Sequence, residues 1–204
     1  MFDHNLKNLY QLLKIPFLAS LVLTSSSCAQ QTGTTKNDKE IDVSSFFDSS
    51  HHWYDINDDD KIITPLPDQK KYHASDISGI ADNILLFQKS NGGWPKNYDM
   101  LAILTENQRQ SVAASRDDTN ATTFDNGATH SQIEYLARAY SHTGNTRYKE
   151  ACLHGIDFIF KSQYANGGWP QFYPDTSGYR KYITFNDSAM VGVMKVLQDR
   201  KSVV

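Results

Sequence analysis

An internal repeat constrains the fold of this chain more than any other feature of its sequence. The segment Q-K-S-N-G-G-W-P at 88–95 returns as Q-Y-A-N-G-G-W-P at 163–170. An acidic turn follows each copy, T-F-D-N-G-A at 123–128 and T-F-N-D-S-A at 184–189. Each unit thus combines a helix, a G-G-W-P loop, a linker, an acidic turn and a second helix. Tandem units of this kind predict a helical toroid, in which like-ended loops gather on one face.

Hydrophobic spacing predicts that both units are helical. Over 76–90, apolar residues recur on one face at helical intervals, and the N-G-G turn then ends the helix. Similar patterns predict helices over 129–141 and 146–163, and a further helix that starts near 186. Strand patterns are nearly missing from the sequence, so we expect an all-α chain of helix hairpins in series.

The N-terminal region has the pattern of an export signal followed by a tether. Two lysines precede the apolar stretch 15–23, which is shorter than the roughly 20 residues of a membrane-spanning helix. Small residues before Cys28 predict a lipoprotein signal over 1–28 with Cys28 as the lipidation site, and plain secretion is the alternative. The polar composition of 29–50 predicts a flexible tether, which leaves 51–204 for the folded domain.

The charge of the chain limits the classes of partner. A formal net charge of −3 and a pI near 6.1, without a dense Lys/Arg cluster, exclude a nucleic-acid-binding protein.

The segment 55–60 begins like a calcium loop, but Asp60 stands where such a loop needs glycine, and Leu66 where it needs glutamate. We therefore expect a solvated turn there. Cys152 has no partner once Cys28 is lipidated or removed, which predicts a buried core residue.

The two acidic turns are the strongest candidates for chemistry. Asp125 with Asn126, and Asn186 with Asp187, each stand where a helix is expected to begin. Helix capping alone would explain either pair, because Asp and Asn are preferred N-caps. Their equivalent places in the repeat, however, would bring the two pairs toward one rim. Carboxylate and amide oxygens are ligands that Ca²⁺ accepts, so we predict Asp125, Asn126 and Asp187 as metal ligands.

The G-G-W-P loops have a structural and a functional interpretation. Glycines and a buried tryptophan are enough to end a helix and fix the following turn. In the functional interpretation, aromatic edges and polar side chains of these loops line a sugar groove, and Lys96 binds a substrate carboxylate. On that basis we predict Asn91, Trp94 and Lys96 as substrate-binding residues, and we add Asn186 of the second acidic turn to them.

Four motifs in order, N-G-G-W-P-K-N, T-T-F-D-N-G-A-T, N-G-G-W-P-Q-F-Y-P and I-T-F-N-D-x-A-M, resemble those of family 10 of the pectate lyases. The resemblance implies an (α/α)3 toroid, Ca²⁺ as cofactor and β-elimination of polygalacturonate, the backbone of pectin. It also implies that Asp125 and Asp187 hold the metal with Asn126 beside them. Ser188 stands where the family often has another acid, so the sequence departs from the family there.

In that family the catalytic base is an arginine beyond the last acidic turn, and no arginine of this chain matches its motif. We therefore expect an incomplete toroid whose catalytic residue is unknown, with no lyase activity from these 204 residues alone. The resemblance and the signal together imply a monomer, secreted by a bacterium or held as an outer-membrane or cell-surface lipoprotein. Its only expected membrane contact is the lipid on Cys28.

Two other classes of protein compete with this interpretation. The spacing Q-x-x-x-G-x-W also occurs in triterpene cyclases, but these need a D-x-D-D motif, and the nearest run here, at 57–60, starts with asparagine. A non-catalytic, surface-anchored glycan-binding lipoprotein would keep the sugar groove without the base. An arginine on the same face, found in sequence downstream of residue 204, would favour the lyase over this alternative, and titration with oligogalacturonate, with and without Ca²⁺, would test the binding directly.

Overall fold

The structure, a computed structural model, describes residues 40–56 and 60–198. The predicted signal peptide, Cys28 and the tether up to residue 39 lie outside this range. The described residues form six α-helices: α1 Phe47–Tyr54, α2 Ile77–Phe87, α3 Glu106–Ala114, α4 His130–Thr143, α5 Thr146–Ser162 and α6 Ala189–Gln198. They also form short 3-10 turns: η1 Ser44–Phe46, η2 Thr119–Ala121, η3 Asp125–Gly127, η4 Gly178–Lys181 and η5 Asn186–Ser188. The predicted all-α class is confirmed.

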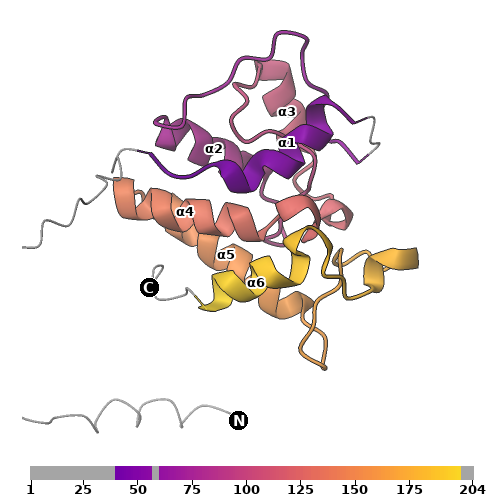
Figure 1. Ribbon diagram of the computed structural model, residues 1–204. Coiled ribbons are helices and arrows are strands. Elements are labelled where there is room, and N and C mark those ends of the chain that lie inside the picture. Colours follow the sequence, from indigo (N-terminus) through magenta and orange to yellow (C-terminus); the bar gives the residue numbers. More distant parts are fainter. Residues whose placement is uncertain (1–39, 57–59, 199–204) are drawn as a thin grey trace, which may run out of the picture. The chain divides into compact units, whose positions relative to one another are not determined.

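Helices α4 and α5 form a hairpin, against which α2 packs. Gly144, with a φ of 70°, ends α4, and the Asn145 side chain accepts a hydrogen bond from the backbone N–H of Arg147 to begin α5. Helix α4 also contacts α2 and α6 (Figure 1). This arrangement is consistent with part of an all-α toroid. None of the helices in the described ranges is long and apolar enough to cross a membrane.

The two G-G-W-P loops repeat the same hydrogen bonds, so the sequence repeat is also a structural repeat. Each tryptophan indole N–H donates to a carbonyl of the preceding helix, Trp94 to Ile84 at 2.7 Å and Trp169 to Ile159 at 2.9 Å. Each glutamine amide donates to the first glycine carbonyl, from Gln88 at 3.0 Å and from Gln163 at 2.9 Å. The indole bonds satisfy carbonyls in the last turn of each helix, and the glutamine bonds close each loop onto the helix end.

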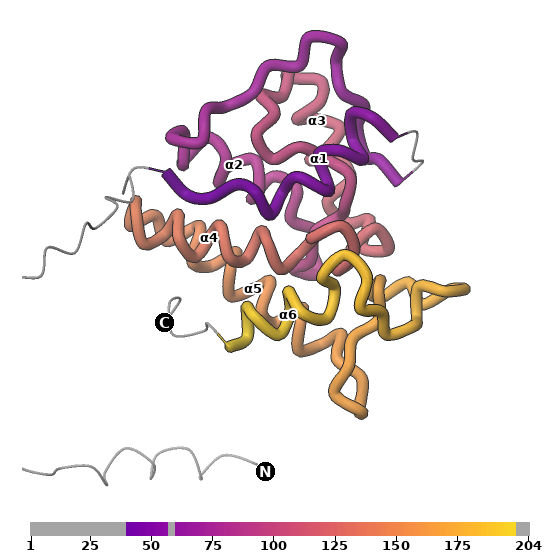
Figure 2. Tube along the Cα trace, viewed as in Figure 1, coloured from indigo at the N-terminus to yellow at the C-terminus, as the bar shows by residue number. Residues whose placement is uncertain are grey.

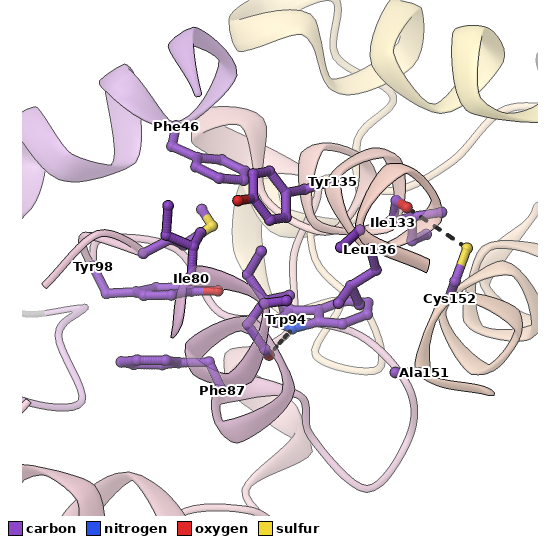
Figure 3. Packing of buried hydrophobic residues seen from close by; sticks show 14 of the residues in the cluster. Phe46, Ile80, Phe87, Trp94, Tyr98, Ile133, Tyr135, Leu136, Ala151 and Cys152 are labelled. Atoms are coloured by element: carbon purple, nitrogen blue, oxygen red, sulfur yellow. Dashed lines mark hydrogen bonds between the residues drawn. The ribbon is translucent and has the colours of Figure 1, made fainter. Parts of the chain in front are cut away.

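The first of these loops belongs to the main hydrophobic core. In Figure 3 the indole of Trp94 lies among buried side chains that include Ile80, Leu136 and Ala151. A Cβ at Gly155 of α5 would lie 2.7 Å from the Trp94 ring, so this glycine lets the helix approach the indole. Cys152 is also buried in this cluster, as predicted, and its Sγ lies 3.6 Å from the Ile133 carbonyl oxygen.

The structure differs from the sequence prediction before α2 and between α2 and α4. Residues 41–50, predicted as tether, contain η1 and the first half of α1, and Ile41 and Phe46 are buried. The Phe46 ring lies 5.4 Å from that of Tyr135 in α4 (Figure 3), which explains why this polar segment is ordered. Helix α3 was not predicted because its sequence is mostly polar. A capping box formed by Thr105 and Gln108 begins it instead.

Candidate functional site

The two acidic turns share a left-handed backbone at their second residue and lie side by side. Turn η3 precedes α4 and η5 precedes α6, and the two turns contact each other (Figure 2). Asn126 has φ and ψ of 49° and 37°, and Asp187 has 48° and 32°. Both values lie in the left-handed region, which Asn and Asp tolerate better than most residues. The residue types in these turns are therefore compatible with their unusual backbone.

The carboxylate and the amide exchange places between the two turns. Asp125 is equivalent to Asn186 in the repeat, and Asn126 is equivalent to Asp187. The two aspartates nevertheless lie close enough to influence each other. Desolvation raises the pKa of Asp187 above its ordinary value, and the negative charges of Asp125 and Asp48 raise it further. The fold thus brings two carboxyl groups from separate repeat units into one site.

Asp125 is buried, with a relative exposure of 5%, and its two carboxylate oxygens have different environments. Oδ2 accepts a hydrogen bond from the Lys96 ammonium at 2.9 Å, while Oδ1 is buried and has no hydrogen-bond partner among the residues that the structure describes. A buried carboxylate oxygen in that state is costly unless another group, such as a cation, satisfies it. The helix-capping alternative does not describe Asp125, because Thr129 occupies the N-cap position of α4.

Hydrogen bonds tie the first acidic turn to the first G-G-W-P loop. The Thr129 hydroxyl donates to the Thr123 carbonyl at 2.8 Å and accepts from the backbone N–H of Trp94 at 3.1 Å. The Asn126 amide donates to Asn97 Oδ1 at 2.8 Å. Lys96 lies in the sequence between Trp94 and Asn97, which these bonds hold in place. The loop therefore fixes the position of the Lys96 ammonium against Asp125.

A second cation, Arg180, lies beyond Lys96 and was not singled out from the sequence. Its guanidinium donates to Asp175 at 2.7 Å and lies 4.4 Å from the centre of the Phe172 ring. Asp60 joins the two cations, at 3.5 Å from Arg180 and 3.7 Å from Lys96. Asp60 is far away in sequence, so no local pattern could have revealed this network.

The structure assigns different surroundings to the predicted substrate-binding residues. Trp94 is fully buried, so its prediction as a sugar contact is wrong, and the indole belongs to the core. The Asn91 side chain donates to Thr122 Oγ1 at 3.0 Å and accepts from the Gly93 N–H at 3.1 Å, which gives it a role in the turn. Lys96 is largely buried against Asp125, and Asn186 is exposed beside Asp187.

The residues present fit a hard cation only in part. Asp125 Oδ1 and the Asp187 carboxylate offer oxygens of the kind that Ca²⁺ prefers, and the Asn126 and Asn186 amides adjoin them. Among residues 40–56 and 60–198, no three His, Cys, Asp or Glu side chains group closely enough to hold a metal ion. Six to eight oxygen ligands would thus require amides, backbone carbonyls, water or a ligand.

Comparison with known proteins places this site in a family. A model described as pectic acid lyase matches residues 88–203, which contain both G-G-W-P loops and both acidic turns. The chain belongs to the pectic acid lyase family. Its membership confirms the resemblance seen in the four sequence motifs. No curated protein matches the chain.

Two solved structures of family 10 polysaccharide lyase from Cellvibrio cellulosa are similar to this member of the pectic acid lyase family. One is 35% identical with a TM-score of 0.48. The other, an aspartate-to-alanine variant in complex with trigalacturonic acid, is 36% identical with a TM-score of 0.49. Each match covers 60% of this chain, which spans 35% of the length of either solved chain.

Proposed function

We propose that this chain supplies the calcium site of a pectate lyase that cleaves polygalacturonate by β-elimination. Family membership supports the reaction class, and the paired carboxylates of the acidic turns support the cofactor. The observation that carries the proposal is Asp125 Oδ1, a buried carboxylate oxygen that has no hydrogen-bond partner in the described part of the chain and lies near a second carboxylate. Two such groups in contact repel each other unless a proton or a cation lies between them.

In the proposed site, Asp125 and Asp187 would hold Ca²⁺, with Asn126 beside them. When bound, Ca²⁺ would neutralise the uronate carboxylate and so acidify the adjacent C5–H, whose proton is lost in the elimination. The chain's own residues arrange this chemistry. Lys96 holds Asp125 Oδ2, which leaves Oδ1 for the metal, and the left-handed backbone at Asp187 belongs to the turn that carries the second carboxylate.

Lys96 and Arg180 would bind carboxylates of the polyanionic substrate at the edge of the site. Both cations flank the Phe172 ring, at 5.6 Å and 4.4 Å from its centre. Their present partners are the carboxylates of Asp60, Asp125 and Asp175. Incoming uronate carboxylates would compete with Asp60, the more exposed member of this network, for these cations. Asn186, exposed beside Asp187, remains a proposed substrate contact.

Calcium binding to the full chain tests this proposal directly. We expect isothermal titration to detect one Ca²⁺ site that Asp187→Asn weakens by at least roughly tenfold, because one of two anionic ligands is removed. Asp68→Asn, a change at an exposed aspartate outside the site, is the matched control. Equal Ca²⁺ affinity in the wild type and Asp187→Asn would refute the assignment of the site.

The reaction is tested separately from the metal. Polygalacturonate is incubated with the protein and Ca²⁺, and the ultraviolet absorbance of the unsaturated product is followed. Because no arginine of this chain matches the family's motif for the base, we expect Ca²⁺-dependent binding of trigalacturonic acid with no rise in absorbance, and a rise would show that one of the chain's own residues acts as the base. The lipid anchor at Cys28 and export from a bacterial cell remain proposals, which mass spectrometry of the mature protein would test.

A further inference from the structure

A hollow of about 690 Å³ lies between α2, α3 and α5. Its lining comes from the second half of α2 and the residue that follows it, from Arg109 of α3 and Arg116 after it, and from the first half of α5. It includes no residue of η3 or η5, so it is distinct from the calcium site proposed above. Its volume is within the usual range of small-molecule sites, about 300–1,000 Å³.

Three arginines from different parts of the chain line this hollow: Arg109 of α3, Arg116 after α3 and Arg147 of α5. Arg147 lies 3.7 Å from Asp82, but both side chains are well exposed, and such a pair is weak in water. Neither Arg109 nor Arg116 has an ion pair within the described part of the chain. Their guanidinium groups are therefore available to an anion, and a guanidinium can bind a carboxylate through two parallel hydrogen bonds.

The acidic side chains that line the hollow determine which class of anion fits it. Asp82 and Glu150 also face the hollow, so three cations there meet two carboxylates. A polyanion with closely spaced phosphates would be repelled by these acids, whereas an acidic sugar carries one carboxylate per residue and several hydroxyl donors. Carboxylates accept hydrogen bonds from hydroxyl groups. The mixed charges therefore favour an acidic carbohydrate over a nucleic acid.

The wall of the hollow is apolar in part and firmly held. Leu85 and Leu86 of α2 contribute apolar surface, which suits the C–H faces of a sugar ring. Gln88 is fixed by two hydrogen bonds, to the carbonyls of Gly92 at 3.0 Å and Ala151 at 2.9 Å. Because these bonds connect α2, the G-G-W-P loop and α5, the wall keeps its shape without a ligand.

We propose that this hollow is a second binding site, which takes an acidic oligosaccharide through the three arginines and needs no calcium. It goes beyond the proposed function, since its ligand class follows from its own lining and it performs no elimination. A protein that holds a uronate polymer at two places would gain affinity for long chains over short ones.

Calorimetric titration of trigalacturonic acid into the full chain, with a calcium chelator present, tests the proposal. We expect binding that falls by roughly tenfold or more in the double variant Arg109→Gln, Arg116→Gln, because each charged hydrogen bond lost costs about that much. Asp187→Asn should keep this binding while it loses Ca²⁺ affinity, so the two sites can fail independently. Thermal unfolding of the double variant checks that it is folded, and Arg116→Glu, a charge reversal at an exposed residue, provides a second test.

Two further ligands separate acidic sugars from other occupants. Galactotriose, which lacks carboxylates, should not bind, and inorganic phosphate should compete only weakly. The proposal is wrong if trigalacturonic acid does not bind in chelator, or if the arginine variants bind it as well as the wild type does. It is also wrong if galactotriose binds equally, or if phosphate alone fills the site with comparable affinity.

Discussion

At the scale of single residues, Lys96 determines how Asp125 can act. The side chains of this ion pair are 10% and 7% exposed, so each charge depends on the other. Sequence reasoning identified Asp125, Asp187 and Lys96 because acidic and basic residues within repeated motifs stand out. It misassigned Trp94, because an aromatic residue beside glycines fits a sugar platform as well as a core, and only packing distinguishes the two. It also missed Arg180, whose partner Asp60 is distant in sequence.

Substitution of Lys96 by methionine should destabilise the calcium-free protein. The change leaves the buried Asp125 carboxylate without its cation, and breaking a buried pair in this way costs roughly 3 kcal/mol or more. Saturating Ca²⁺ should then restore more stability to Lys96→Met than it adds to the wild type, because the metal replaces the missing positive charge. Urea unfolding with chelator and with Ca²⁺ measures both effects. Lys96→Arg, which keeps the charge, is the control; a methionine variant as stable in chelator as the wild type would contradict the prediction.

At the scale of elements, the position of η5 depends on how α6 packs against α4. The contact uses Gly192 of α6, where an added Cβ would lie 2.4 Å from Cε1 and Nε2 of His130. His130 is buried, and desolvation together with the charge of Lys195 lowers the pKa of its imidazole to about 4. The hydrophobic period of the sequence predicted α2, α4, α5 and α6 because each buries one face. It could not reveal α3, which is mostly polar, or the His130–Gly192 contact, since both depend on tertiary packing.

Replacement of Gly192 by alanine should therefore loosen α6. The imidazole of His130 is confined in the core, so relief of the clash requires a shift of the helix, and such overpacking costs about 1–3 kcal/mol. Because η5 directly precedes α6, we expect a lower Ca²⁺ affinity together with the lower thermal midpoint. Val191→Ala changes an exposed residue of the same helix and should have little effect. Equal thermal midpoints for Gly192→Ala and Val191→Ala would show that His130 moves aside without loss of stability.

At the scale of the molecule, the proposed metal site joins the two repeat units. Asp125 follows the first G-G-W-P loop and Asp187 follows the second, so one ion would bridge segments that begin α4 and α6. The repeat itself was visible in the sequence, and so was the toroidal class that it predicts. The sequence also shows that the carboxylate and the amide exchange places between the turns, but it does not show that the two carboxyl groups lie close together. Only the contact of η3 with η5 brings the two carboxyl groups together.

Calcium should consequently stabilise both units at once. A ligand that binds only the folded state at about 100 times its Kd adds roughly 2.7 kcal/mol to the free energy of unfolding. Mg²⁺ should add less, because it requires near-octahedral geometry and loses its water reluctantly. Hydrogen exchange followed by mass spectrometry should show Ca²⁺-dependent protection in the first turns of both α4 and α6, and Asp187→Asn should abolish it in both. Protection confined to one helix would mean that the ion binds one turn only, and the two carboxylates would then owe their proximity to the packing of α4 against α6 and not to a shared metal.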